Sequence, residues 1–129
     1  MINILGAAAL AFMSAQSGAA LQLAQQSEAT APLPELPMPE ATALRCATAF
    51  GLATKRQKHG DATALQWPNI EERGREFFVN SLQQIMLEHD LAEQQVQSLV
   101  IRELADLEQP GKLADVMPGC LLLLDASGL

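Results

Sequence analysis

Two cysteines, Cys46 and Cys120, are the side chains of this sequence best suited to covalent chemistry. A thiol redox centre usually keeps its cysteines close together, as in Cys-x-x-Cys, so that a resolving thiol is at hand. These two stand 74 positions apart. The spacing favours a structural disulfide, with two buried free thiols as the alternative and a catalytic or metal-binding role as the least favoured interpretation. Such a long closed loop would contribute about 4–5 kcal/mol to stability on the chain-entropy model.

The other reactive side chains show no spacing typical of a known site. A zinc site needs several Cys, His or carboxylate ligands at recognisable intervals, and the two histidines, His59 and His89, stand apart. The sequence contains no Gly-rich phosphate loop, no Gly-x-Ser-x-Gly, no His-Glu-x-x-His and no Cys-x-x-Cys-His. Two carboxylate pairs could serve acid–base chemistry but fit solvated helix faces, Glu71 with Glu72 and Asp106 with Glu108, and Ser127 near Asp125 is no better a candidate as a nucleophile. We therefore expect no catalytic residue, no cofactor and no metal.

A first helix, predicted over residues 40–58, positions Cys46. Ala43, Cys46, Ala47 and Phe50 recur at steps of three and four, which places them on one apolar face. Three basic residues crowd the last turn, where cations suit the negative end of the helix dipole: Lys55, Arg56 and Lys58. The thiol of Cys46 is therefore expected to point into the core.

A second helix is predicted from Ile70 to His89. Asn69 and Glu72 have the spacing of a capping box at its start. Its apolar side chains form a wide stripe, which we interpret as core: Phe77, Phe78, Leu82, Ile85 and Met86. Gly74 would allow a close crossing with another helix.

A third helix is predicted from a cap at Asp90 to about Glu108, and the short connection predicts an antiparallel hairpin with the second helix. Residues 112–117 predict a short helix broken or kinked at Pro118. The apolar run Leu121–Leu124 predicts a buried segment. The sequence thus predicts an all-α fold, a small four-helix bundle over residues 40–129 with one disulfide.

The N-terminal part of the chain has the pattern of an export signal. Residues 1–20 carry no charged side chain, and their apolar run is followed by small residues, as in a signal peptide. The alternative is an anchor to the inner membrane formed by residues 2–24. Residues 21–39 are rich in proline and predict a flexible linker. The expected localisation is periplasmic or secreted, an oxidising environment in which a disulfide persists.

The net charge of −7 limits the possible partners. An acidic surface repels phosphate backbones and anionic lipid, so we expect no nucleic-acid partner and no stable membrane insertion once the signal is cleaved. A protein partner stays possible, and the chain is expected to be a monomer or a homodimer.

Three stretches carry a resemblance: LRCATAFGLA, ERGREFFVNSLQQIM and MPGCLLLLDASGL. They resemble short exported helical proteins of alphaproteobacteria with two cysteines and uncharacterised activity, over roughly residues 40–129. The resemblance implies compartment and fold only. Our functional hypothesis is a non-catalytic interaction or structural protein of the periplasm. The alternative is a stress chaperone of the acid-activated type, and a less favoured one is an enzyme or cofactor-binding bundle.

Overall fold

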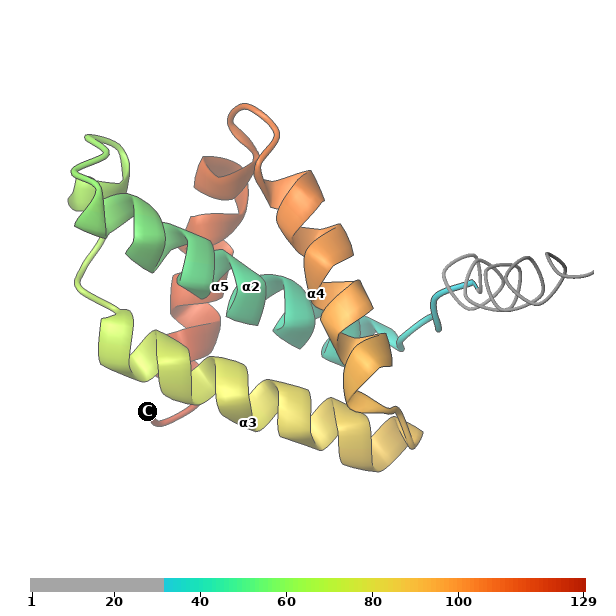
Figure 1. Cartoon of the computed structure of the whole chain (residues 1–129). Helices are drawn as coiled ribbons and strands as arrows, with labels where there is room; N and C mark the ends of the chain where they lie inside the picture. The colour runs from blue at the N-terminus through green and yellow to red at the C-terminus, as the bar shows by residue number, and fades with distance from the viewer. Residues whose placement is uncertain (1–31) are drawn as a thin grey trace, which may run out of the picture. The chain divides into compact units, whose positions relative to one another are not determined.

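A computed structural model describes residues 32–129, and their fold is all-α (Figure 1). The elements are α2 (Met38–Lys58), a 3-10 helix η1 (Ala64–Gln66), α3 (Glu71–His89), α4 (Glu93–Leu107) and α5 (Lys112–Ala126). No strand occurs among these described residues. The predicted all-α class with four helices is confirmed. The predicted signal peptide or anchor, and most of the predicted linker, lie outside the described residues.

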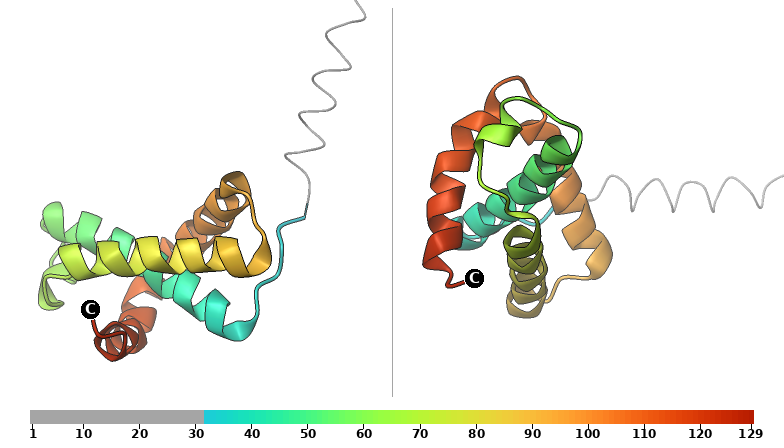
Figure 2. Two further views of the ribbon diagram at one scale, coloured as in Figure 1. Left: turned by 90° about the horizontal axis from the view of Figure 1, so that it is seen from below. Right: turned by 90° about the vertical axis from the view of Figure 1, so that its left-hand side faces the viewer.

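Helix α2 is the central element of the domain. It contacts η1, α3, α4 and α5, and Figures 1 and 2 show the other helices arranged around it. Its buried residues are spread around most of the helix rather than along one stripe: Leu44, Cys46, Ala47, Thr48, Ala49, Phe50, Leu52 and Ala53. Alanine at three of these positions lets neighbouring helices approach it from several sides.

The core has two parts. The larger one is centred on Phe50, whose ring meets that of Phe77 edge to face at 5.3 Å. The smaller one joins Leu44, Ile85 and Leu99 of three different helices, and Leu33 and Leu36 pack against it. The C-terminal end of the proline-rich stretch is therefore attached to the domain, and α2 begins two residues earlier than expected.

The disulfide links the central helix to the last one. Cys46 of α2 and Cys120 of α5 are bonded, with their Cα atoms 5.1 Å apart. The two residues are only 4% and 2% exposed, as the apolar face of the first predicted helix indicated. The bond therefore lies inside the larger core, shielded from solvent.

The two predicted caps have different roles in the structure. Ile70, not Asn69, is the N-cap of α3, and the Asn69 side chain instead accepts a hydrogen bond from the Glu71 N–H at 3.1 Å. Asp90 ends α3 in the left-handed conformation, with φ of 50°. The α4 helix begins later, where the Gln95 side chain accepts a hydrogen bond from the Ala92 N–H at 2.9 Å. Short polar side chains such as Asn and Asp are common at both the N-terminal and the C-terminal ends of helices. The local sequence pattern could therefore not distinguish the start of one helix from the end of another.

Of the break or kink predicted at Pro118, the break does not occur, because α5 is one helix from Lys112 to Ala126 with the proline inside it. Proline removes the hydrogen bond to the carbonyl four residues earlier, that of Ala114. Pro118 and Ala114 are both exposed, so water can satisfy this carbonyl. The apolar run that follows is thus part of the same helix.

Gly74 is the point of closest approach between α3 and α2. A Cβ atom at this position would lie 3.0 Å from Phe50 Cβ, which is fixed to the α2 backbone. We expect Gly74→Ala to lower the free energy of unfolding by about 1–3 kcal/mol, because the two helices must separate. Urea denaturation followed by circular dichroism measures this change.

Gly51→Ala is the matched control for this substitution. Gly51 lies in α2, and apart from the nearby backbone of its own helix nothing would lie within 4 Å of its added Cβ. Alanine should therefore raise stability here by about 0.5–1 kcal/mol through helix propensity alone. If Gly74→Ala stabilised the protein to the same extent, the close crossing would be disproved.

Candidate functional site

A groove of about 650 Å³ lies between α3 and α4, and we call it the α3–α4 groove. Figure 1 shows the two helices diverging from their short connection rather than lying side by side as the predicted antiparallel hairpin. The groove is lined by five residues of each helix: Phe78, Val79, Leu82, Gln83 and Met86, and Glu93, Val96, Gln97, Val100 and Ile101. Its volume is in the range of common ligand sites.

The groove exists because α3 and α4 each carry an apolar stripe, and only part of each stripe packs into the core. On α3, Phe77 and Ile85 are buried in the core, whereas Phe78, Leu82 and Met86 are half-buried and reach the groove. The prediction that this stripe is entirely core is therefore only partly correct. The outer edge of each stripe remains available to another molecule.

Two apolar side chains at the rim of the groove are exposed to solvent. Val79 of α3 is 45% exposed and Ile101 of α4 is 66% exposed. Burial of such side chains against a partner would be favourable by about 25 cal/mol per Å² of apolar surface removed from water. The rim is thus an energetically suitable contact surface.

Glu93 is the only charged residue among those that line the groove. Residues 76–101 contain no lysine or arginine and four acidic residues: Glu76, Glu88, Asp90 and Glu93. The nearest cations along the two helices, Arg75 and Arg102, form ion pairs with Glu71 at 3.3 Å and Glu103 at 3.8 Å. The groove therefore combines apolar walls with one carboxylate in its lining, and Lys55 of α2 borders the adjoining hollow that shares Phe78 and Val100 with it.

The carboxylate pairs considered from the sequence take part in ion pairs that join helices. Glu71 pairs with Lys58, and the hydrogen bond from Lys58 together with its charge lowers the pKa of Glu71. Asp106 lies 3.1 Å from Arg45, which links α2 to α4. Glu72 and Glu108 are exposed. Glu71 and Asp106 therefore each join two helices by an ion pair, whereas Glu72 and Glu108 lie at the surface.

The remaining candidates each have a partner of their own. His59 Nδ1 lies 2.7 Å from the Lys55 carbonyl oxygen at the end of α2. Asp125 forms an ion pair with Arg73 at 2.8 Å, and the Ser127 hydroxyl donates to the Leu124 carbonyl. Ser127 and Asp125 are therefore each engaged separately rather than with one another.

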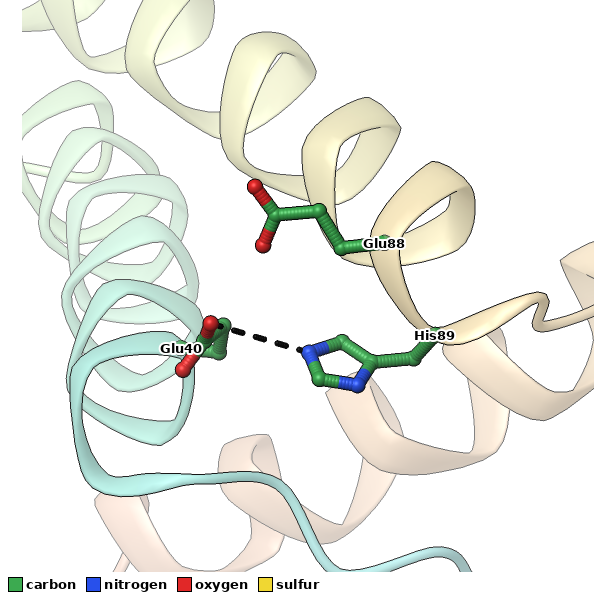
Figure 3. A group of neighbouring side chains, drawn as sticks. All are labelled: Glu40, Glu88 and His89. Atoms are coloured by element: carbon green, nitrogen blue, oxygen red, sulfur yellow. Dashed lines mark ion pairs between the residues drawn. The ribbon is translucent and has the colours of Figure 1, made fainter.

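His89 is brought close to two carboxylates, Glu40 and Glu88 (Figure 3). Ligand atoms of the three side chains all lie within 4.8 Å of one another. Glu40 comes from the start of α2, whereas Glu88 and His89 come from the end of α3. Glu40 is far from Glu88 and His89 in the sequence, so no sequence pattern predicted this cluster. Of the three residues, only Glu88 and His89 are adjacent.

The chain matches no protein-family profile, no curated protein and no solved structure. Within residues 32–129, no helix combines the length and the apolarity that crossing a membrane would require. Functional inference therefore depends on the two features described above, the α3–α4 groove and the cluster around His89.

Proposed function

We propose that this protein is a non-catalytic interaction protein that binds an amphipathic helix of a partner protein in the α3–α4 groove. The observation that carries this proposal is the groove itself, an apolar trough about 650 Å³ in volume between two helices of the domain. Helix-in-groove binding places apolar anchors of the guest, spaced three or four residues apart, into such a trough.

The charge pattern specifies the chemistry of the partner. A segment of 26 residues around the groove carries carboxylates and no lysine or arginine, so a guest helix with Lys or Arg beside its apolar face is complementary. A second copy of this chain would bring acidic surface against acidic surface, which is unfavourable near neutral pH. We therefore propose a basic partner helix rather than a homodimer through this groove.

The proposed site of action is outside the cytoplasm. The buried disulfide between Cys46 and Cys120 supports this, because disulfides persist in oxidising compartments. The uncharged, apolar sequence of residues 1–20 supports export. The proposal thus places an exported domain where it meets partner helices in the periplasm or outside the cell.

The test uses two synthetic amphipathic peptides of about four helical turns, with identical leucine faces and either lysine or glutamate elsewhere. We expect the lysine peptide to bind at least about tenfold more tightly than the glutamate peptide, because only the former complements the groove. Val79→Asp with Ile101→Asp should reduce binding of the lysine peptide by about tenfold or more, since both substitutions place charge in the apolar contact. Fluorescence anisotropy measures both effects.

Leu65→Asp with Leu122→Asp provides the matched control. These leucines are 60% and 71% exposed and lie outside the groove. The control variant should bind the lysine peptide as the parent does. Equal loss in both double variants, or no preference between the two peptides, would contradict the proposed site.

The alternative function, a chaperone of the acid-activated type, predicts a different dependence of binding on pH. The groove is present in the native fold, so the lysine peptide should bind at neutral pH without prior exposure to about pH 3. An acid-activated chaperone would instead gain affinity for unfolded clients under acidic conditions. Client aggregation measured at neutral and acidic pH therefore distinguishes the two functions.

A further inference from the structure

We propose that Glu40, Glu88 and His89 form a binding site for one divalent metal ion, with Zn²⁺ as the best match to the donor set. The three side chains face a common space between the start of α2 and the end of α3 (Figure 3). None of them lines the α3–α4 groove, so this inference is independent of the proposed function. It also departs from the expectation of no metal.

The geometry is close to that of a bound site. His89 Nε2 lies 3.7 Å from Glu40 Oε1. Two ligands at about 2.0–2.2 Å from one tetrahedral zinc ion are themselves roughly 3.3–3.5 Å apart. The Glu88 side chain is exposed, and its ligand atom lies within 4.8 Å of those of the other two. Side-chain rotations alone are therefore sufficient to bring the three ligands to an ion.

Two ligand atoms lack the hydrogen bonds that shielded polar atoms normally have. Glu40 Oε2 and His89 Nε2 are both inaccessible to solvent and have no hydrogen-bond partner among the described residues. Such atoms carry a desolvation cost of about 1–3 kcal/mol each unless something replaces the lost water. A metal ion bound at this position would satisfy both atoms at once.

The charge of the cluster also lacks compensation. Within residues 32–129, neither Glu40 nor Glu88 forms an ion pair with a lysine or an arginine. The Gln84 side chain donates a hydrogen bond to Glu88 Oε1 at 2.8 Å, which leaves Oε2 of this carboxylate for another contact. Two carboxylates beside one imidazole attract a divalent cation, and Gln84 orients one of the ligands.

The donor types favour zinc over harder cations. An imidazole nitrogen suits Zn²⁺, whereas Mg²⁺ and Ca²⁺ prefer sites built from oxygen alone. Three protein ligands with water in a fourth position are a common zinc arrangement. Both cysteines are in the disulfide and supply no competing thiolate. The bound ion would link two helices that are distant in the sequence.

The experiment titrates Zn²⁺ into the untagged, chelator-treated full chain by isothermal titration calorimetry. We expect one site per chain, and we expect Glu40→Gln and His89→Gln each to weaken binding by about tenfold or more. At about 100 times the dissociation constant, Zn²⁺ should raise the Tm by roughly 10 °C in the parent and not in these variants. Circular dichroism verifies that each variant folds.

His59→Gln and Glu72→Gln are the matched controls, because they remove the other imidazole and an exposed carboxylate outside the cluster. Both should bind Zn²⁺ as the parent does. Glu88→Gln is a third variant of the cluster: it should also weaken Zn²⁺ binding and, because this side chain is exposed, should leave the fold intact. Absence of Zn²⁺ binding, binding that survives His89→Gln, or binding abolished by His59→Gln would each overturn the proposal.

Discussion

Replacement of both Cys46 and Cys120 by alanine is expected to lower the free energy of unfolding by about 4–5 kcal/mol, the largest effect in this protein. The bond joins residues 74 positions apart, so its loss releases a long loop in the unfolded chain. It also leaves a space in the larger core, where both side chains are almost fully buried. Because small domains have a net stability of only about 5–15 kcal/mol, the variant should be marginally folded.

Urea denaturation of the oxidised parent, the reduced parent and the double variant measures this effect. The reduced parent separates loss of the cross-link from loss of side-chain volume, because it keeps both sulfur atoms. We expect the reduced parent and the double variant to unfold at much lower urea concentrations than the oxidised protein. A midpoint that reduction leaves unchanged would show that the bond contributes nothing to stability.

Phe50→Ala is the second substitution with a large expected effect, a loss of about 3–5 kcal/mol. Phe50 is 0% exposed and lies where α2 crosses α3, against Gly74 and the edge of the Phe77 ring. Alanine would leave a cavity that neighbouring helices cannot close, since the Gly74 contact already holds their backbones at close range. Denaturation by urea or heat, followed by circular dichroism, measures the loss.

Two further variants make this measurement specific. Phe50→Leu keeps most of the apolar volume and should cost clearly less than Phe50→Ala. Leu87→Ala removes a leucine of α3 that is 84% exposed, so its effect should stay within about 0.5 kcal/mol. If Phe50→Ala and Leu87→Ala changed stability equally, the assignment of Phe50 to the centre of the core would be wrong.

Local patterns in the sequence were sufficient for the class of fold and for the surroundings of the cysteines. The steps of three and four around Cys46 and Phe50 placed both on a buried face, as the structure shows. Pro118 shows where local reasoning fails, because the helix continues through it on an exposed side. Whether a proline interrupts a helix depends on what surrounds the unpaired carbonyl, which is information outside the local sequence.

The candidate sites depended even more on tertiary structure. Phe78 and Met86 have the same periodicity as buried residues, and only the divergence of α4 from α3 leaves them facing a groove. Glu40 comes close to His89 only because α2 and α3 pack across one another.

The sequence by itself determined that residues 40–129 form helices, that Cys46 faces inward, and that the net charge is negative, because these properties follow from residue type and local periodicity. The tertiary structure alone decided which part of each apolar stripe is covered and which polar side chains meet. The physical reason is that crossing angles between helices result from the packing of all the side chains together, and no single segment encodes them.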